Sequence, residues 1–201
     1  MKVALITGGL GFIGSQIARN MIQDNIVDKA VLLDHYGGFI NPLMSDFQDY
    51  RRYRLEGIED NVIIERGETR NSIIMTNLID KYRPEYVIHT AALPLAKIDN
   101  LNAAEAREGS VDSTAGILEI INYFKLKDGY CPSRFTYFSS SMVYGDFQSE
   151  IATESHQKRP KEAYGTMKLA GEVVARGLAD FYDIPYTIIR PSAVYGPTDM
   201  N

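Results

Sequence analysis

Short runs of apolar residues alternate along this chain with longer, helix-like segments. Most of the apolar runs are continuous instead of alternating with polar residues, which is typical of strands that are covered on both faces. We predict six strands, at residues 2–7, 29–34, 61–66, 86–91, 134–139 and 186–191. We predict helices near residues 12–24, 71–82, 101–127 and 161–183, whereas the crossover from 35 to 60 is less regular.

This order of strands and helices predicts an α/β fold with a doubly wound, mostly parallel sheet and right-handed crossovers. Ligands of such sheets bind beyond the carboxyl ends of the strands, where the strand order reverses. The 201 residues are 45% hydrophobic and 23% charged, which suits one substantial core better than two. We therefore expect a single domain over residues 1–201, with the functional residues at the strand ends.

Charge, cysteine content and the first residues exclude several classes of function. The net charge of −5 indicates neither a nucleic-acid partner nor an anionic membrane, and we expect the basic cluster at residues 51–54 to be a solvated face. Residues 1–9 predict a buried strand and not a signal peptide, and no apolar stretch approaches the length of a membrane span. Cys131 is the only cysteine, so no intramolecular disulfide forms, which fits a reducing, cytoplasmic compartment.

A glycine-rich segment, TGGLGFIG at residues 7–14, connects the first predicted strand to the first predicted helix. It satisfies both the G-x-G-x-x-G and the G-x-x-G-x-x-G pattern. Glycines let the backbone turn sharply and approach a phosphate, and the helix start directs free N–H groups and a positive dipole end toward it. We predict a pyrophosphate site for a dinucleotide at Gly8, Gly11, Phe12, Ile13 and Gly14.

Asp34 ends the second predicted strand, 20 residues after Gly14. In a dinucleotide-binding unit a carboxylate at this place accepts hydrogen bonds from the adenosine ribose hydroxyls, although an Asp that forms a turn is the simpler alternative. The charge of Asp34 would repel a 2′-phosphate, and no Arg follows it directly, so the sequence favours NAD over NADP.

The third and fourth strands end in residues with less specific signals. Glu68 is expected either near the adenine or as a cap of the helix that begins near Asn71. Ala91 and Ala92 follow the fourth strand, where small residues would let a flat cofactor lie against the backbone. His89 in the same strand is expected to be a packed residue and not an acid or base.

Reactive side chains gather after the fifth strand. It ends in Ser139, Ser140 and Ser141, which alone would indicate turn chemistry. Tyr164 and Lys168 lie four residues apart in the next predicted helix and therefore on one of its faces. This spacing alone favours a solvated face. A functional interpretation becomes the better one because the serine segment and the Tyr164–Lys168 helix are expected to reach the same crevice.

Six motifs occur along the chain from residue 3 to residue 197, in the order TGGLGFIG, Asp34, HTAA, FSSSMVYG, YGTMK and IIRPSAVYGP. Together they resemble the extended short-chain dehydrogenase/reductase superfamily, and within it the NAD-dependent epimerase/dehydratase family that acts on nucleotide sugars. The resemblance implies a Rossmann-like, three-layer α/β/α domain that binds NAD, with Ser139 and Pro191 among the cofactor contacts.

The resemblance also implies a catalytic set. Tyr164 would be the acid/base, Lys168 its electrostatic partner and a ligand of the nicotinamide ribose, and Ser140, or else Ser141, the third member. At pH 7 only about one free phenol in a thousand is ionised, and lowering its pKa to about 7 needs roughly 4 kcal/mol. We expect Lys168 and the positive nicotinamide ring to supply this jointly, so that Tyr164 takes a proton from a sugar hydroxyl while Ser140 holds its oxygen.

Departures from the family pattern bear on the reaction. Dehydratases of the family usually carry an Asp-Glu pair directly after the catalytic residue, where this chain has Ser141 and Met142. This disfavours 4,6-dehydration and leaves epimerisation, which needs no such acid. Ser110 and Ala193 stand where the family often has Asn, which weakens any transfer of nucleotide-sugar specificity.

The leading hypothesis is an NAD-dependent nucleotide-sugar epimerase. The alternatives are an NAD-dependent dehydrogenase or reductase of another hydroxyl or carbonyl compound, and a non-catalytic NAD-binding protein.

In the family the last motif leads into a smaller C-terminal substrate lobe, which we expect this chain to lack. Relatives often dimerise through the helices that correspond to 101–127 and 161–183, so a homodimer is a candidate assembly, although no decisive apolar seam is visible. Residues 35–61, rich in aromatic and basic side chains, are a candidate cover for the adenine or a subunit interface.

Overall fold

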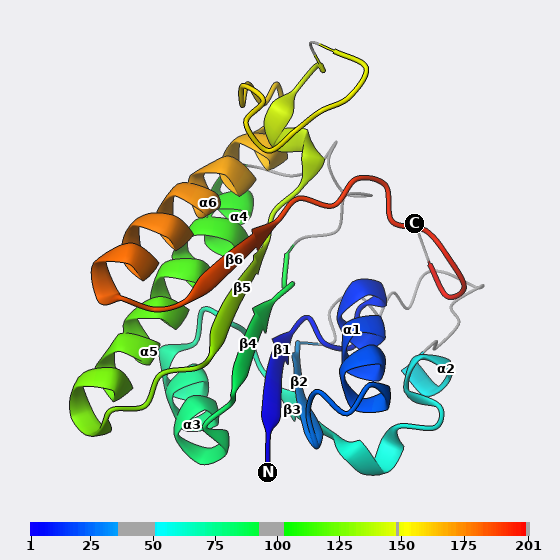
Figure 1. The fold of residues 1–201 in the computed structure, drawn as a ribbon, viewed down its shortest axis with the longest axis vertical. Helices are drawn as coiled ribbons and strands as arrows, with labels where there is room; N and C mark the ends of the chain where they lie inside the picture. Colours follow the sequence, from blue (N-terminus) through cyan, green and yellow to red (C-terminus); the bar gives the residue numbers. More distant parts are fainter. Residues whose placement is uncertain (36–50, 93–102, 148, 200–201) are drawn as a thin grey trace.

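The computed structural model describes residues 1–35, 51–92, 103–147 and 149–199. Six parallel strands form one sheet in the order β3-β2-β1-β4-β5-β6, which confirms the predicted doubly wound parallel sheet (Figure 1). The order reverses between β1 and β4, so the carboxyl ends of these two strands flank the switch point. The strands are β1 Val3–Thr7, β2 Lys29–Asp34, β3 Val62–Arg66, β4 Tyr86–His89, β5 Arg134–Phe138 and β6 Tyr186–Ile189.

Strands β4, β5 and β6 end one or two residues earlier than predicted, because the chain turns away from the ladder at the edge of the sheet. The amide of Thr90 donates to the carbonyl of Thr7 at 3.3 Å, and the amide of Ser141 donates to the carbonyl of Pro191 at 2.9 Å. These bonds join the loops that follow neighbouring strands. The residues that leave the strands early are among those predicted to be functional.

The helices α1 Phe12–Gln23, α3 Ser72–Tyr82 and α6 Ala163–Tyr182 agree with the prediction. The helix predicted at 101–127 is instead divided, and its first two residues lie outside the described residues. Its parts are α4 Ala103–Arg107, the π-helical segment η3 Glu108–Asp112 and α5 Ser113–Asp128. Hydroxyls explain the division: Ser113 donates to the carbonyl of Gly109 at 2.9 Å and Thr114 to that of Ser110 at 2.7 Å, in competition with helical N–H groups.

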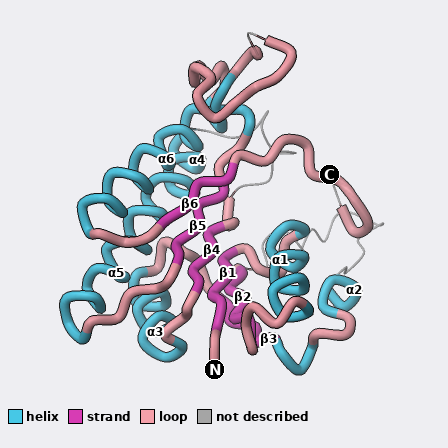
Figure 2. The backbone as a smooth tube through the Cα atoms, viewed as in Figure 1, coloured by secondary structure: helices cyan, strands magenta, loops and turns pink. Residues whose placement is uncertain are grey.

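Alternate residues of the strands supply two cores, one on each face of the sheet. On β1, Val3 and Leu5 pack with residues of α3, α5 and α6, whereas Ala4 and Ile6 pack with residues of α1 and of the short helix α2 Arg51–Leu55. Figures 1 and 2 show these helices on opposite faces, which gives the predicted three layers. The short elements α2 Arg51–Leu55, η1 Glu59–Asn61 and η4 Ser141–Tyr144 were not predicted.

The prediction that residues 51–54 form a solvated face is wrong for Arg54. This side chain is only 6% exposed, because α2 packs beside α1. Its guanidinium donates to the carbonyl of Leu10 at 2.9 Å and to the hydroxyl of Thr198 at 3.2 Å. Arg54 thus ties the glycine-rich loop to the segment that follows β6.

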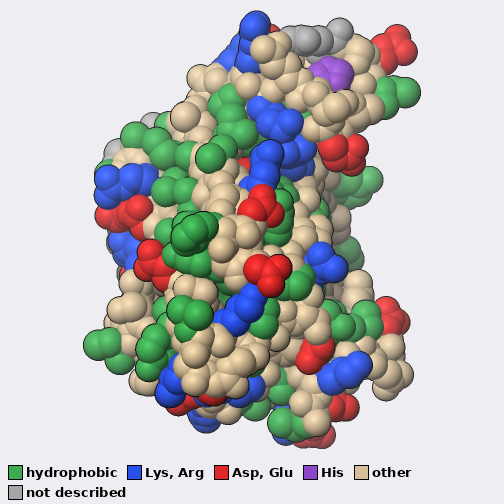
Figure 3. Space-filling model, turned by 60° about the vertical axis from the view of Figure 1, so that its left-hand side comes forward, with side chains coloured by type: hydrophobic (Ala, Val, Ile, Leu, Met, Phe, Trp, Pro, Cys, Tyr) green, Lys and Arg blue, Asp and Glu red, His purple; other side chains and the backbone are tan. Residues whose placement is uncertain are grey.

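The surface over α5 and α6 mixes residue types. Figure 3 turns this side of the molecule toward the viewer and shows hydrophobic, acidic and basic side chains interspersed on it. Exposed apolar residues on these two helices are Tyr123, Leu126, Val173 and Phe181. No helix among the described residues is long and apolar enough to cross a membrane. The homodimer stays a prediction.

Candidate functional site

The loop after β1 has a backbone that only glycine permits at several positions. Gly8 adopts a left-handed conformation with φ +66°, and its amide donates to the carbonyl of Leu33 at 2.8 Å. A Cβ on Gly14 would lie 2.4 Å from the carbonyl oxygen of Gly8, and one on Gly9 would lie 2.7 Å from Cβ of Leu32. The loop therefore packs directly on the neighbouring strand and on the helix that follows.

The start of α1 faces the same loop. Gly11 is its N-cap residue and, because it has no side chain, leaves the first helical N–H groups without a side-chain cap. The first turn of α1 also carries no acidic residue. Free N–H groups and the positive end of the helix dipole suit a phosphate here, next to Phe12 and Ile13.

Asp34 ends β2 beside this loop, as predicted. Its side chain is buried, and one carboxylate oxygen accepts a 3.3 Å hydrogen bond from the amide of Leu10. The other oxygen lies 3.7 Å from Nδ1 of His35. A carboxylate in this place is held at the edge of the loop, where a ribose bound next to the pyrophosphate site would meet it.

Glu68 does not cap the helix that follows it. Asn71 is the N-cap residue of α3, and its side-chain oxygen accepts from the amides of Ile73 and Ile74, both at 3.1 Å. Because the side chain of Asn71 already accepts from these amides, the start of α3 needs no cap from Glu68. Glu68 instead pairs with Arg70 at 2.8 Å on the surface, and the adenine alternative stays a prediction.

The loop after β4 touches the glycine-rich loop. A Cβ on Gly8 would lie 3.0 Å from Cα of Ala91, and the amide of Ala91 donates to the hydroxyl of Thr7 at 3.2 Å. Ala91 and Ala92 thus lie at the switch point of the sheet. Residues 93–102, which follow Ala92, lie outside the described residues.

His89 is a packed strand residue, as predicted. Its Nδ1 lies 2.7 Å from the hydroxyl of Thr7, and its Nε2 lies 3.0 Å from that of Ser113. Because the Ser113 hydroxyl donates to Gly109, Nε2 must carry the proton and Nδ1 must accept. Burial, followed by the charge of Lys168, lowers the pKa of His89 to about 3, so this histidine is neutral at physiological pH.

The three serines after β5 have different surroundings. Ser139 is buried, and its hydroxyl has no hydrogen-bond partner among the described residues. Ser140 is the N-cap residue of η4, and its hydroxyl oxygen accepts from the amide of Met142 at 3.2 Å. Ser141 is half-buried and lies in the wall of a neighbouring cavity.

Tyr164 and Lys168 lie in the first two turns of α6 and point into the molecule, being 8% and 2% exposed. The solvated-face reading of this pair is therefore excluded. The ammonium group of Lys168 donates to the carbonyl of Phe138 at 2.7 Å and lies 5.8 Å from the centre of the Tyr164 ring. Thus β5 and α6 place the serines and the Tyr–Lys pair together.

The pKa values of this pair follow from burial. Desolvation lowers the pKa of Lys168 to about 8, although the charge of Glu172 acts in the opposite direction. Desolvation also raises the pKa of Tyr164 to about 12. Lys168 alone therefore does not lower the pKa of Tyr164 in this arrangement, because its ammonium group is directed at Phe138.

Two glycines of α6, which the sequence analysis did not single out, allow this arrangement. A Cβ on Gly165 would lie 2.7 Å from the carbonyl of Met142 in η4. A Cβ on Gly171 would lie 2.2 Å from the hydroxyl of Tyr137 and 2.6 Å from the carbonyl of Ser110 in η3. Because both positions lack a side chain, α6 packs directly against the loop of Ser140 and against the π-helical segment.

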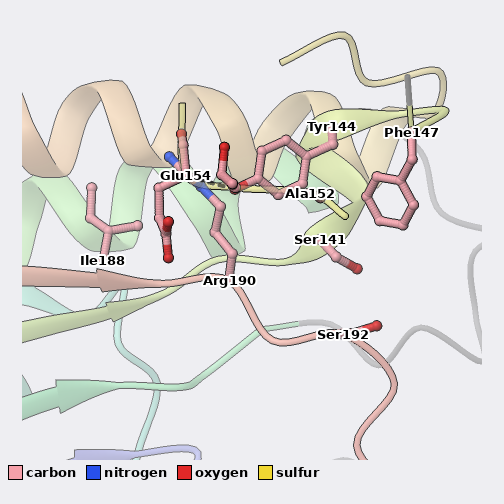
Figure 4. Close-up of a pocket in the computed structure, with 9 residues that line it drawn as sticks. Ser141, Tyr144, Phe147, Ala152, Glu154, Ile188, Arg190 and Ser192 are labelled. Atoms are coloured by element: carbon pink, nitrogen blue, oxygen red, sulfur yellow. Dashed lines mark hydrogen bonds between the residues drawn. The ribbon is translucent and has the colours of Figure 1, made fainter. Parts of the chain in front are cut away.

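A cavity of about 260 Å³ lies beside the serine loop, between η4 and the residues after β6 (Figure 4). Figure 4 shows Arg190 extending from the end of β6 toward Tyr144 and Glu154. The sequence analysis assigned no role to Arg190, although this residue stands in the motif IIRPSAVYGP, and it missed the buried partner Glu172. The cavity is lined by Ser141, Tyr144, Phe147, Ala152, Thr153, Glu154, Ile188, Arg190 and Ser192.

The residues at the strand ends fit a dinucleotide in three respects. The helix that begins after the glycine-rich loop offers N–H groups without a side-chain cap. Asp34 offers a carboxylate at the end of the next strand. The unpartnered hydroxyl of Ser139 is a buried polar group that a ligand in the crevice would satisfy.

Solved structures with similar folds contain NAD or a nucleotide sugar. UDP-glucuronic acid 4-epimerase from Bacillus cereus, in complex with NAD, is 25% identical with a TM-score of 0.77, over 98% of this chain and 58% of that one. UDP-glucose 4-epimerase from Thermotoga maritima, with UDP-glucose, is 23% identical with a TM-score of 0.76, over 97% of this chain and 57% of that one.

Sequence comparison leads to the same group of proteins. The dTDP-glucose 4,6-dehydratase of Neisseria gonorrhoeae is 30% identical in an alignment of 206 positions, which covers 98% of this chain and 56% of that protein. The chain therefore spans a little over half the length of the relatives it matches. The model of the NAD dependent epimerase/dehydratase family matches residues 4–201. This chain belongs to the NAD-dependent epimerase/dehydratase family.

Proposed function

We propose that this chain binds NAD and carries the catalytic groups of a nucleotide-sugar epimerase. One observation carries the proposal: Ser140, Tyr164 and Lys168 are buried, and the ammonium group of Lys168 donates to the carbonyl of Phe138, which brings α6 to the carboxyl end of β5. The glycine-rich loop follows β1 at the same edge of the parallel sheet. Relatives in this family act on nucleotide sugars, as the names of the Neisseria and Bacillus proteins state.

The cofactor would lie along the carboxyl edge of the sheet. The glycine-rich loop and the start of α1 would hold the pyrophosphate, and Asp34 would accept from the adenosine ribose. Asp34 also favours NAD over NADP, because its charge would oppose a 2′-phosphate. The residues proposed to contact NAD are Gly8, Gly11, Phe12, Ile13, Gly14, Asp34, Glu68, Ala91, Ala92, Ser139, Tyr164, Lys168 and Pro191.

When bound, NAD would accept a hydride from a sugar carbon and return it to the opposite face. Tyr164 would take the proton of the sugar hydroxyl and later give it back, and Ser140 would hydrogen-bond the same oxygen. Because burial raises the pKa of Tyr164 to about 12, the phenol needs positive charge brought close to it. Lys168 supplies one such charge if its ammonium group leaves the carbonyl of Phe138 for the Tyr164 side.

The composition of η4 favours epimerisation over dehydration. Ser141 and Met142 follow Ser140 directly, and η4 carries no carboxylic acid that could protonate a leaving hydroxyl. Epimerisation requires no such group, since the oxidised sugar only has to turn over before the hydride returns. The dehydratase relatives are therefore similar in fold and cofactor but differ, we propose, in this step.

Replacing Tyr164 by Phe tests the proposal. We expect the Tyr164→Phe variant to bind NAD with an affinity within a few-fold of the wild type, because the phenyl ring keeps its packing, and to lose turnover of a nucleotide sugar. Turnover is measured as the change in isomer ratio, together with absorbance of NADH. Net NADH accumulation in the wild type would indicate the dehydrogenase alternative, and full activity of the Tyr164→Phe variant would contradict the acid/base role.

A further inference from the structure

A buried ion pair joins the catalytic helix to the end of β6. Glu172, one turn after Lys168 in α6, is completely buried, and Arg190 is 14% exposed. The pair is bidentate, with Nε to Oε1 and Nη2 to Oε2 both at 2.7 Å. Removing two charges from water is costly, and such a pair often stabilises a protein no better than apolar residues would. Its presence next to a candidate catalytic lysine therefore calls for a role in geometry or charge.

The third nitrogen of Arg190 connects the pair to the serine loop. Nη1 donates to the hydroxyl of Tyr144 at 2.9 Å and to the carbonyl of Glu154 at 3.4 Å (Figure 4). Tyr144 is the last residue of η4, whose N-cap is Ser140. One guanidinium thus contacts α6, which carries Tyr164 and Lys168, and η4, which follows the catalytic serine.

We propose that Glu172 and Arg190 are positioning residues that hold the Ser140 loop against the helix of Tyr164 and Lys168 and that balance the charge next to Lys168. The inference rests on the proposed function for its catalytic meaning. Neither residue reaches the reacting atoms; each acts through Lys168 or through η4.

The groups that face Lys168 determine how the pair acts on its charge. The ring centre of Tyr137 on β5 lies 5.3 Å from the ammonium group and that of Tyr164 lies 5.8 Å away, while His89 on β4 is neutral. Within the described part of the chain, Glu172 is the carboxylate whose charge acts on Lys168, and it favours the charged ammonium. Glu172 raises the pKa of Lys168. Since Arg190 neutralises Glu172, we infer that Arg190 acts on this pKa in the opposite direction.

The first test measures the charge of Lys168 directly, without cofactor or substrate. The Lys168 side chain is titrated by NMR of lysines labelled with ¹³C at Cε, and its signal is assigned by comparison with Lys168→Met; the midpoint is the pH at which half of Lys168 has lost its proton. We expect Glu172→Gln to lower the midpoint and Arg190→Gln to raise it, each by about one pH unit, and the double variant to return near the wild type. Asp180→Asn and Arg176→Gln make the same charge changes at exposed positions of α6 and should leave the midpoint in place.

Midpoints that do not move, or that move in the same direction in both single variants, would overturn the charge balance. If Arg190→Gln does not fold, Arg190→Lys replaces it. This variant keeps the charge but not the bidentate geometry, so the midpoint should stay while kcat falls.

The second test isolates the link to the serine loop. Tyr144→Phe removes the hydroxyl that Arg190 contacts and leaves the Glu172 pair intact. We expect kcat to fall by about tenfold with little change in KM, in NAD affinity or in the Lys168 midpoint, because only the placement of Ser140 changes. Unchanged kcat would overturn the positioning role. If the wild type shows no turnover at all, the proposed function fails, while the Lys168 midpoints still decide the charge balance.

Discussion

Backbone atoms form the half of the candidate site around β1, whereas buried side chains form the half around β5 and β6. In the first half, residues such as Gly14 carry no Cβ, which lets α1 pack directly against the glycine-rich loop, and the first N–H groups of α1 have no side-chain cap. In the second half Ser140, Tyr164 and Lys168 come from separate segments and depend on packing for their positions. The two halves therefore respond to different perturbations, one to added volume and the other to changes of charge and pH.

The largest effect is expected from adding one methyl group to the backbone half. Gly14→Ala would place a Cβ 2.4 Å from the carbonyl of Gly8, so the loop or the helix has to move. We expect a loss of about 3 kcal/mol in the free energy of unfolding, measured with urea, together with a loss of detectable NAD binding.

The control is Gly116→Ala in α5, where an added Cβ meets nothing within 4 Å. Because alanine is favoured over glycine inside a helix, the free energy of unfolding of this variant should rise by about 0.5–1 kcal/mol. Equal stability of the two variants would break the view that backbone contact defines this half of the site.

The side-chain half should make stability depend on pH through Lys168. The unfolded chain keeps the lysine proton up to a pKa of 10.5, and the folded chain releases it near 8. Between these values the unfolded state binds more protons, so stability rises with pH. From pH 8 to pH 10 we expect the wild type to gain on the order of 2 kcal/mol relative to Lys168→Met, measured by urea unfolding.

Below pH 7 the same comparison serves as its own control, because the folded and unfolded states both hold the proton and the difference should be flat. A difference that does not change between pH 8 and pH 10 would mean that burial does not hold Lys168 near a pKa of 8.

Asp34 is a side chain within the half of the site that backbone atoms otherwise form, so its replacement shows how much a side chain contributes there. Asp34→Ala removes the proposed acceptor for the ribose hydroxyls, so NAD affinity should fall on the order of tenfold, and the preference for NAD over NADP should narrow. Isothermal titration with each cofactor measures both. Asp34→Asn keeps one oxygen acceptor and should lose less affinity; a stronger loss than in Asp34→Ala would contradict the proposed contact.

The elements that sequence analysis predicted well are governed by local rules. The strands follow from continuous apolar runs, and the glycine-rich loop follows from a motif within eight residues, so both can be recognised from short stretches of sequence. The identity of the candidate catalytic residues came from their resemblance to a family. The prediction of a continuous helix at 101–127 was wrong, because the hydroxyls of Ser113 and Thr114 bond carbonyls one turn back and open a π-helical segment.

Contacts between distant residues account for what the sequence analysis missed. In the sequence Arg54 belongs to a basic cluster that suggests a surface, yet contacts with Leu10 and Thr198 bury it. These partners lie 44 and 144 residues away, so the sequence pattern does not indicate the contacts. Arg190 lies in a recognised motif, but its pairing with Glu172 could not be predicted, since it requires the packing of α6 beside β6.

By itself, the sequence determined the order of strands and helices along the chain, the glycine-rich loop and the carboxylate of Asp34, because propensity, periodicity and steric space act over short stretches. Only the tertiary structure decided the state of the candidate catalytic groups. It directs the ammonium group of Lys168 at Phe138 and raises the pKa of Tyr164 to about 12. It also joins the helix that carries them to the serine loop, because Arg190 contacts both Glu172 and Tyr144. Burial and charge depend on which distant segments meet, and that information lies in the packing of the whole chain.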